Sequence, residues 1–463
     1  MSEVSSDKKI SIHFLGAAST VTGSKHLLKT PEKNILVDCG LFQGIKSLRL
    51  KNREPLPVSM SEIDFVILTH AHLDHCGYIP LLVKSGFKGR IFMTPPTRDL
   101  TEIILRDSAK IQEEDAEREN REGFSKHNPS LPLYTMKDVE KAVKQFYVYS
   151  DNQWINISPN IEFRFIKNGH ILGSAFIEVN CLGKKIVFSG DIGRKESLIM
   201  NAPSILDDAD FLVMESTYGD RIHPTMSAKE ELAEIINDTI HEKGNLLIPS
   251  FAVGRAQELM HLINQLKKEI HIPNVPVYMD SPMGADATKI LHKYPAWHKL
   301  SEEECRAVCH DITIITDFHD TQKVIQQKGS KIVIAASGMM TGGRVLEYLK
   351  NYIVDKKNTI LLAGFQAEGT RGRALKEGIH EIKMYGKYYQ VNAKVREITS
   401  LSAHADQQEM LDWLKQFKKK PQKIFLVHGE QQPQEIFRVK IQDELKIEVV
   451  IPKQNDEVLL FSI

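Results

Sequence analysis

Short runs of apolar residues recur along the chain, and several of them end at an acidic residue or a histidine. The run at 65–68 is branched and uninterrupted, which is typical of a buried strand, and His70 follows it. Similar strand-like segments precede the following residues: Asp38, His170, Asp191, Glu215, His404 and His428. Strand ends of a layered α/β protein can lie along one rim, where sites are commonly built. We therefore expect these side chains to share one site.

The pattern changes from about Glu215 onwards, where strands begin to alternate with helices. Predicted strands cover 246–249, 275–279, 331–335 and 359–362, and a predicted helix covers about 254–268. This alternation favours a parallel βα arrangement with its own sheet. The earlier pattern returns after residue 392. We therefore expect one domain built from 1–208 and completed by 393–463, interrupted by an inserted domain over 209–392.

Composition limits the class of protein. The 463 residues exceed the usual size of a single core, and 42% hydrophobic with 26% charged residues is ordinary for a globular protein. The 60 basic and 60 acidic residues balance, so any surface for a polyanion must be local. Five scattered cysteines and the lack of a long apolar run argue against a disulfide framework and a membrane span. We expect a cytoplasmic protein.

The segment 69–75 concentrates groups that can bind a metal. His70, His72, Asp74 and His75 follow the strand at 65–68 directly. Imidazole and carboxylate suit zinc, and the same donors also accept manganese or iron. The alternative is a surface cluster of polar residues, but such groups rarely crowd a strand end without a function.

The dispersed residues complete a site for two ions. One ion would be held by His70, His72 and His170. The other would be held by Asp74, His75 and His428, and Asp191 would bridge the two ions. Such a bridge suits two ions about 3.5–4 Å apart, with a hydroxide held between them as nucleophile. Asp38 is expected to accept a hydrogen bond from a liganding group and to orient it. We predict two Zn²⁺ per chain, with Asp74 and Asp191 also acting in catalysis.

Glu215 and His404 each stand at a strand end and have no place among the seven ligands. A carboxylate paired with an imidazole keeps the imidazole protonated, ready to donate to a leaving oxygen. This pair would supply the general acid for hydrolysis of an ester or a phosphodiester. The alternative is a structural ion pair.

Glycine-rich and basic segments in the predicted insertion suggest phosphate contacts. Ser337, Gly338 and Arg344 belong to a turn before a predicted helix, where backbone N–H groups can face an anion. Arg371 and Arg373 form a basic loop, and Arg255 opens another helix. Arginine suits bidentate phosphate contacts, although each of these could equally be a solvated surface charge.

The motifs together resemble a known family. The segment 70–75 resembles the H-x-H-x-D-H signature of the metallo-β-lactamase superfamily, and Asp38, His170 and Asp191 resemble its other core motifs. The segments at 215–219, 402–406 and 427–430 resemble motifs A, B and C of the β-CASP nucleases. The resemblance implies a metallo-β-lactamase αββα sandwich with an inserted β-CASP α/β domain. It also implies a zinc-dependent phosphodiesterase that binds RNA between two domains, and His428 in motif C resembles the RNA-processing branch.

The favoured hypothesis is a dinuclear zinc ribonuclease that cleaves single-stranded RNA endonucleolytically. A 5′-to-3′ exoribonuclease is the first alternative, because the motifs do not separate the two modes. A small-molecule ester or thioester hydrolase needs neither the insertion nor the Glu215–His404 pair, and a non-catalytic RNA-binding scaffold would not need an intact ligand set. The sequence leaves the oligomeric state open, a homodimer included.

Overall fold

The computed structural model describes residues 9–122, 129–224 and 226–463. The chain divides into two compact units. Unit 1 comprises Met1–Ser197, Ala202–Ile222 and His404–Ile463, and unit 2 comprises Leu198–Asn201 and His223–Ala403. Unit 1 is therefore assembled from segments that lie on both sides of unit 2 in the sequence.

Two seven-stranded sheets form the centre of unit 1. The first has the order β22-β1-β2-β3-β4-β5-β6. Its strands are β1 (Lys9–Phe14), β2 (His26–Lys29), β3 (Ile35–Val37), β4 (Phe65–Ile67), β5 (Arg90–Met93), β6 (Phe146–Val148) and β22 (Glu457–Ser462). The second has the order β21-β20-β11-β10-β9-β8-β7. Its strands are β7 (Ile155–Ser158), β8 (Ile161–Lys167), β9 (Ala175–Cys181), β10 (Lys184–Phe188), β11 (Phe211–Met214), β20 (Lys423–Leu426) and β21 (Glu448–Val450).

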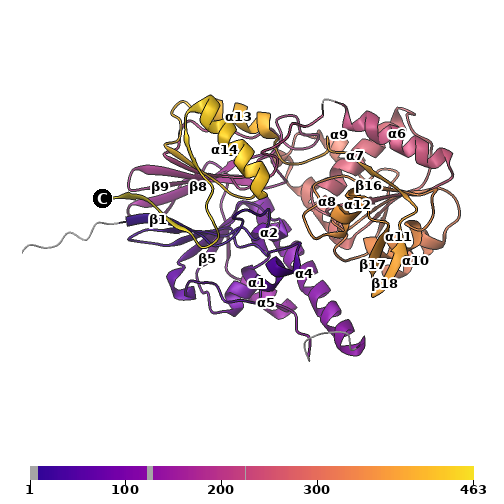
Figure 1. The fold of residues 1–463 in the computed structure, drawn as a ribbon, viewed down its shortest axis with the longest axis horizontal. Coiled ribbons are helices and arrows are strands. Elements are labelled where there is room, and N and C mark those ends of the chain that lie inside the picture. The colour runs from indigo at the N-terminus through magenta and orange to yellow at the C-terminus, as the bar shows by residue number, and fades with distance from the viewer. Residues whose placement is uncertain (1–8, 123–128, 225) are drawn as a thin grey trace, which may run out of the picture. The chain divides into compact units, whose positions relative to one another are not determined.

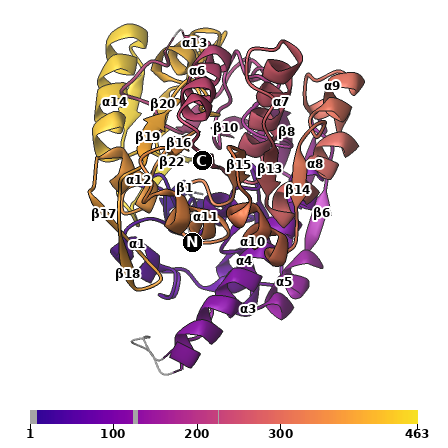
Figure 2. The ribbon, with the colours of Figure 1, turned by 90° about the vertical axis from the view of Figure 1, so that its right-hand side faces the viewer.

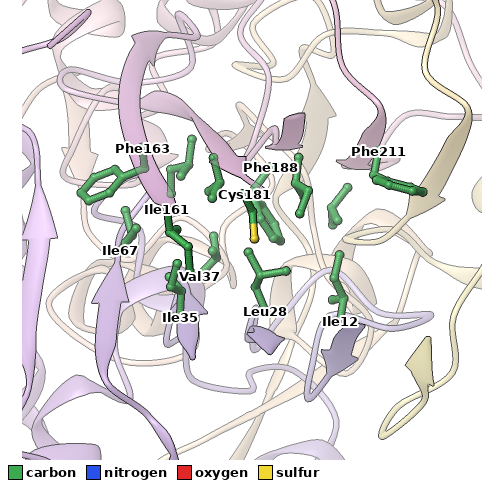
Figure 3. Close-up of a cluster of buried hydrophobic side chains, with 14 of the residues drawn as sticks. Ile12, Leu28, Ile35, Val37, Ile67, Ile161, Phe163, Cys181, Phe188 and Phe211 are labelled. Carbon is green, nitrogen blue, oxygen red and sulfur yellow. The ribbon is translucent and has the colours of Figure 1, made fainter. Parts of the chain in front are cut away.

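The two sheets pack face to face through apolar side chains. Figure 3 shows Ile12, Leu28 and Val37 from the first sheet opposite Phe163 and Phe188 from the second. Burying side chains of this size stabilises a fold by about 1.5–3 kcal/mol each. The sandwich core therefore supplies much of the driving force for folding of unit 1.

Helices cover the outer faces of both sheets. Both faces of β11 are buried, which explains why its apolar run is uninterrupted. Phe211 and Val213 point into the sandwich, whereas Leu212 and Met214 pack in the cluster that contains Trp413 from α13. Figure 1 shows α13 and α14 on one side of the sandwich and α1, α2, α4 and α5 on the other. The helices are α1 (Lys46–Lys51), α2 (Leu73–Cys76), α3 (Ile79–Lys84), α4 (Pro95–Glu122), α5 (Met136–Val143), α13 (Gln407–Lys415) and α14 (Gln431–Leu445), with a 3₁₀ turn η1 (Met60–Glu62). This αββα arrangement confirms the predicted fold of unit 1.

Unit 2 contains a parallel sheet of the predicted βα type. The order is β14-β13-β15-β12-β16-β19, and all neighbours run parallel. Its strands are β12 (Leu246–Pro249), β13 (Val277–Asp280), β14 (Thr313–Ile315), β15 (Ile332–Ala335), β16 (Thr359–Leu362) and β19 (Lys394–Glu397). A separate antiparallel hairpin consists of β17 (Glu381–Met384) and β18 (Lys387–Gln390), visible in orange in Figure 2. The helices are α6 (Ala228–His241), α7 (Arg255–Lys268), α8 (Pro282–Lys293), α9 (Glu302–Ala307), α10 (Phe318–Gln326), α11 (Val345–Tyr352) and α12 (Arg371–Lys376), with a 3₁₀ turn η2 (Pro295–Trp297).

The unit boundaries lie later in the chain than the predicted positions 209 and 392. The strand β11 pairs with both β10 and β20, so it belongs to unit 1. At the other end, β19 pairs with β16 at the edge of the unit 2 sheet. A fully apolar strand such as β11 has the same sequence pattern in either sheet, so the pattern alone does not assign it to a unit. Within the described part of the chain, no helix is long and apolar enough to cross a membrane.

Candidate metal centre

The histidine-rich segment lies just after β4, as predicted. His70 and His75 are buried, and the segment turns at His72, the N-cap of α2, whose backbone is still extended. The single turn of α2 then carries Asp74 and His75 back toward the strand end. A strand followed by one helical turn thus presents four donor groups at one place.

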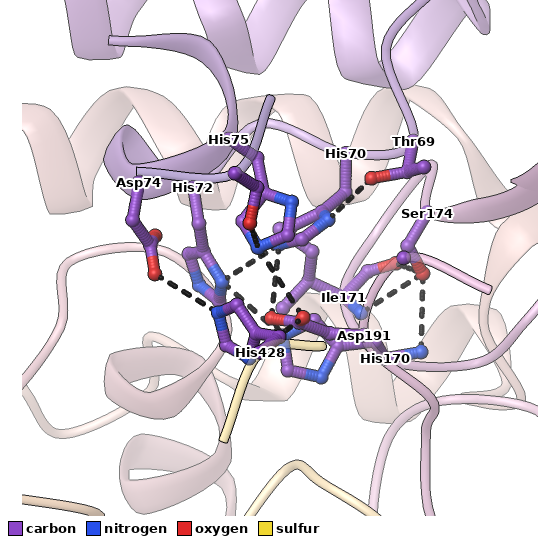
Figure 4. Close-up of polar contacts among 12 residues, drawn as sticks. Thr69, His70, His72, Asp74, His75, His170, Ile171, Ser174, Asp191 and His428 are labelled. Atoms are coloured by element: carbon purple, nitrogen blue, oxygen red, sulfur yellow. Dashed lines mark hydrogen bonds and ion pairs between the residues drawn. The ribbon is translucent and has the colours of Figure 1, made fainter. Parts of the chain in front are cut away.

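A first donor set gathers three imidazoles and one carboxylate. Nδ1 of His72 lies 3.1 Å from Nε2 of His70 and 3.2 Å from Nε2 of His170. Oδ2 of Asp191 lies 3.4 Å from Nε2 of both His70 and His170. The three rings stand nearly perpendicular to one another, with centroids 4.9–5.0 Å apart (Figure 4). Four donor atoms therefore converge on one point.

The loop between β8 and β9 positions His170 for this set. The hydroxyl of Ser174 accepts hydrogen bonds from the backbone N–H groups of His170 and Ile171, at 3.0 and 3.1 Å. Gly173 has a φ of +84°, and a Cβ there would lie 2.5 Å from the backbone nitrogen of Thr97. Only glycine fits this turn, so the loop holds the imidazole in place.

A second donor set lies on the other oxygen of Asp191. Oδ1 of Asp191 is 3.2 Å from Nε2 of His75 and 3.4 Å from Nδ1 of His428. Nε2 of His428 lies 3.3 Å from Oδ2 of Asp74. The carboxylate of Asp191 therefore reaches both sets, one oxygen to each, which is the arrangement expected of a bridging ligand.

Asp38 adjoins the second set through His75. Oδ2 of Asp38 lies 2.8 Å from Nδ1 of His75, while Oδ1 accepts the backbone N–H of Thr69 at 2.8 Å. The hydroxyl of Thr69 donates to Asp38 and lies 3.0 Å from Nδ1 of His70. One buried carboxylate thus fixes the His75 ring and, through Thr69, the strand end that carries His70.

The donor atoms fit divalent metal ions in spacing and in charge. Tetrahedral zinc with ligands at 2.0–2.1 Å separates neighbouring donors by about 3.3 Å, close to the distances in the first set. Burial, reinforced by the neighbouring His70, lowers the pKa of His72 to about 3, and burial also lowers the pKa of His170. These imidazoles are therefore neutral and offer free electron pairs.

In the second set the carboxylates favour positive charge. Although burial opposes it, Asp191 and Asp38 raise the pKa of His75 well above its usual value. Burial likewise opposes ionisation of Asp191, yet the surrounding imidazoles hold the pKa of that carboxyl well below its usual range. The second set thus stabilises a cation, and a metal ion can take the place of the proton on His75.

Glu215 and His404 lie together beside both donor sets. Nδ1 of His404 is 3.1 Å from Oε2 of Glu215, and the His404 ring centroid lies 4.5 Å from that of His170 and 6.1 Å from that of His428. Burial works against protonation, but Glu215 raises the pKa of His404 to about 9. The predicted pair therefore forms, and its imidazole is held protonated.

Several residues of the site escaped the sequence analysis. Thr217 places its hydroxyl 2.6 Å from Oε2 of Glu215 and 3.1 Å from Nδ1 of His428. Asn168 donates its amide to the backbone oxygens of Ser189 and Asp191. Thr217 follows Glu215 by two residues, and this short spacing could have indicated that Thr217 belongs to the site. Asn168 could not be recognised in this way, because a lone amide in a loop is common.

The residues predicted to bind phosphate belong to unit 2 and contribute to neither donor set. The guanidinium of Arg344 donates to Asp280 at 2.7 Å and to the backbone oxygen of Thr316, and buried Arg255 pairs with Glu258. Their partners are within the unit, and phosphate binding by these two arginines stays a prediction. A lone arginine at a helix start looks the same in a sequence whether or not a carboxylate neutralises it.

The other predicted phosphate contacts also have partners within unit 2. Arg371 donates to the backbone oxygens of Met340 and Lys383, and Arg373 pairs with Glu377. The hydroxyl of Ser337 accepts the backbone N–H of Thr341, and a Cβ on Gly338 would lie 2.9 Å from the backbone nitrogen of Phe251. Phosphate binding by these four residues stays a prediction.

Three family models match the chain. They are the metallo-beta-lactamase superfamily over residues 26–240, the Beta-Casp domain over 256–375, and the Zn-dependent metallo-hydrolase RNA specificity domain over 388–452. The first match covers most of the donor residues described above, and the second lies within unit 2. The predicted family and the predicted insertion are both confirmed.

Curated relatives resemble nearly the whole chain. Ribonuclease TTHA0252 of Thermus thermophilus is 33% identical over 427 residues, which cover 90% of this chain and 92% of the relative. Transcription termination factor FttA of Methanocaldococcus jannaschii is 32% identical over 98% of this chain and 72% of its own length. The RNase J-like protein of the same organism is 33% identical, over 95% of this chain and 97% of that protein.

A solved structure shares the fold. The crystal structure of a protein of unknown function from Enterococcus faecalis V583 superposes with a TM-score of 0.54 at 12% identity, covering 98% of this chain and 100% of that one. This identity supports the architecture alone. The family models and the curated relatives, together with the converging donor sets, leave one conclusion: the chain belongs to the β-CASP family of metallo-β-lactamase-fold hydrolases.

Proposed function

We propose that this protein is a zinc-dependent ribonuclease that hydrolyses phosphodiester bonds of single-stranded RNA, with endonucleolytic cleavage favoured. The observation that carries the proposal is the Glu215–His404 pair beside two donor sets that share Asp191. A small ester hydrolase needs the donor sets but no such acid. The similarity to Ribonuclease TTHA0252 over nine-tenths of the chain supports RNA as the substrate class.

The residues that would hold the metal follow from the geometry. His70, His72 and His170 would bind one ion, and Asp74, His75 and His428 the other, with Asp191 shared. Two bound ions would supply an activated water and stabilise charge on the phosphoryl group. Asp38 would hold the His75 ring in the orientation that directs Nε2 inward.

His404 is proposed as the general acid. Its Nδ1 is hydrogen-bonded to Glu215, and we assign to Nε2 the donation of a proton to the leaving oxygen of the RNA chain. Thr217 hydrogen-bonds to the same carboxylate and limits its rotation. The carboxylate thus orients the imidazole and keeps it charged, and the imidazole delivers the proton.

A sizing gel tests the proposal directly. One single-stranded RNA, labelled in turn at each end, is incubated with the wild type, His404→Ala, and His271→Ala as a control for loss of an exposed histidine. Internal fragments from both labels that disappear only in His404→Ala support endonucleolytic cleavage with His404 as acid. Mononucleotides released from the 5′ end indicate the exoribonuclease alternative. Intact RNA in every lane, with zinc measured in the protein, would contradict ribonuclease activity.

A further inference from the structure

The hydroxyl of Thr217 contacts one residue from each part of the site. It lies 2.6 Å from Oε2 of Glu215 and 3.1 Å from Nδ1 of His428. Glu215 holds His404, whereas His428 belongs to the second donor set. The strands β11 and β20 are parallel neighbours, which brings the segments that follow them together. Thr217 is only 2% exposed, so bulk solvent does not compete for these contacts.

The direction of both hydrogen bonds follows from the groups involved. A hydroxyl has one hydrogen to donate, and an ionised carboxylate can only accept. The distance of 2.6 Å to Glu215 is in the range of a charge-assisted hydrogen bond. The backbone oxygen of His428 is a second acceptor for the hydroxyl, but it is uncharged and lies farther away, at 3.2 Å. The hydrogen of Thr217 therefore goes to Glu215, and the hydroxyl oxygen is left to accept a hydrogen from Nδ1 of His428.

This direction determines which nitrogen of His428 can bind a metal. A neutral imidazole with its hydrogen on Nδ1 has its free electron pair on Nε2. Nε2 of His428 lies 3.3 Å from Oδ2 of Asp74, within the second donor set. The other neighbour of Nδ1 is Oδ1 of Asp191 at 3.4 Å, which is also an acceptor. Both neighbours of Nδ1 thus favour the form of His428 that offers Nε2 to a metal.

The same hydroxyl helps to fix the carboxylate of Glu215. Oε1 of Glu215 accepts the backbone N–H of Ile192, and Oε2 accepts the hydroxyl of Thr217. Both oxygens also lie within 3.2 Å of Nδ1 of His404. Without Thr217, only one of the two oxygens would keep a partner besides His404, and the carboxylate would hold that imidazole less firmly.

We propose that Thr217 is a positioning residue that links the general acid to the second donor set, accepting a hydrogen bond from Nδ1 of His428 and donating one to Glu215. Consecutive hydrogen bonds polarise one another in a buried site. A cation at Nε2 of His428 makes Nδ1–H a stronger donor, and this strengthens the hydrogen bond from Thr217 to Glu215. The role of the acid rests on the proposed function, whereas the effect of Thr217 on metal binding does not depend on RNA.

Zinc affinity tests the metal end of the link. Thr217→Val keeps the shape of the side chain and removes the hydroxyl, whereas Thr217→Ser keeps the hydroxyl. Competition of the full chain with a chromophoric zinc chelator should show one zinc ion bound about 10- to 100-fold less tightly in Thr217→Val, the usual effect of losing the partner of a ligand. Thr217→Ser should bind zinc as the wild type does. Thr217→Ala repeats the test if Thr217→Val fails to fold.

Hydrolysis of two phosphodiesters tests the acid end. The substrates differ only in the leaving group, p-nitrophenyl or phenyl, and the phenyl group depends more on a proton from the acid. At zinc concentrations that saturate each variant, Thr217→Val should lose about 10-fold in kcat on the phenyl ester, the effect of one hydrogen bond to a charged group. The loss on the p-nitrophenyl ester should be smaller. Thr217→Ser should keep the wild-type ratio of the two rates.

Thr239→Val is the matched control for loss of a buried threonine hydroxyl. Thr239 lies on α6 of unit 2, is also 2% exposed, and donates its hydroxyl hydrogen to the backbone oxygen of Ile235 at 2.7 Å. Thr239→Val should leave the zinc affinity and the ratio of the two hydrolysis rates unchanged. Urea denaturation shows that each variant is folded before it is compared.

Wild-type zinc affinity in Thr217→Val would overturn the link, as would a loss of zinc in Thr217→Ser that equals the loss in Thr217→Val. Weaker zinc binding with an unchanged ratio of rates would also overturn it, because the hydroxyl would then serve the metal ligand alone. RNA cleavage is scored separately on the sizing gel. Both expected effects in a chain that leaves RNA intact would contradict the ribonuclease alone, whereas RNA cleavage with wild-type zinc affinity in Thr217→Val would contradict the link alone.

Discussion

Oδ2 of Asp38 lies 2.8 Å from Nδ1 of His75, on the ring edge opposite the nitrogen that faces Asp191. A ligand imidazole held in this way has a fixed ring orientation and a more basic donor nitrogen. Asp38 has a φ of +58° directly after β3, a conformation that asparagine also tolerates. Asp38→Asn should therefore keep the fold while it changes the metal site.

We expect Asp38→Asn to weaken metal binding about 10- to 100-fold, the usual effect of losing a partner that orients a ligand. Competition with a chromophoric zinc chelator measures this affinity. Asp64→Asn, which loses a surface pair with Lys33, serves as control. Wild-type affinity in Asp38→Asn would show that the His75 ring needs no such support.

The metal content of two variants should differ. His170 belongs to one donor set, whereas Asp191 belongs to both. His170→Ala is therefore expected to retain about one zinc ion per chain and Asp191→Ala close to none, from a starting value of two. Elemental analysis of protein purified without chelators gives these numbers. Equal zinc in the two variants would contradict the bridging role of Asp191.

The proposed role of His404 predicts a dependence on the leaving group. His404→Ala should reduce RNA cleavage by about 10²- to 10⁴-fold, the usual contribution of a general acid. A p-nitrophenyl phosphodiester has a leaving group that needs little protonation, so its hydrolysis should fall far less. Parallel losses on both substrates, or a loss of zinc in the variant, would indicate a structural role instead.

Arg344 is expected to stabilise unit 2. Asp280 is fully buried and accepts hydrogen bonds from Arg344, Thr321 and Tyr348 at 2.6–2.7 Å. Arg344→Met leaves this carboxylate without its cation, which costs about 3–5 kcal/mol in a buried pair. Urea denaturation of the full chain measures the loss.

Arg373→Gln is the control for Arg344→Met, because its partner Glu377 is exposed and such pairs contribute less than about 1 kcal/mol. Unchanged stability in Arg344→Met together with weaker RNA binding would instead support the phosphate contact predicted from the sequence.

Lys25 makes stability depend on pH. It is buried, donates to the backbone oxygen of Gly23 at 3.3 Å, and lies 4.5 Å from the ring centroid of Phe42. Burial lowers the pKa of Lys25 to about 8. The folded state thus disfavours the charged form of Lys25. Against an unfolded pKa near 10.4, this lowers the free energy of unfolding by about 3 kcal/mol. The penalty is fully present below pH 8 and disappears as the pH rises toward 10.4.

Lys25→Met, which keeps the volume without the charge, should therefore be more stable than the wild type at pH 7, and the difference should shrink between pH 8 and 10. Urea denaturation across this range measures both effects, with Lys46→Met as the control for an exposed lysine. A difference that does not change with pH would contradict the lowered pKa of Lys25.

The sequence by itself determined the secondary structure that carries the site. The apolar runs at 65–68 and 211–214 became β4 and β11, because side chains of a fully buried strand must be apolar on both faces. The histidines of 70–75 were predictable for a local reason: the donors are adjacent in the chain, and their spacing survives any tertiary arrangement. The recurrence of acidic residues and histidines at strand ends, supported by the family resemblance, connected this segment to His170, Asp191 and His428.

Only the tertiary structure decided how distant residues combine. That the two oxygens of Asp191 serve different donor sets depends on β8, β10 and β20 lying in one sheet, which no local pattern encodes. The same holds for Arg344: its neutralisation by Asp280 reflects the pairing of β13 with β15 and not any feature of the turn that precedes α11. Local sequence sets strand and turn propensity, whereas long-range packing sets which charges meet, and the chemistry of each charged group follows from its partner.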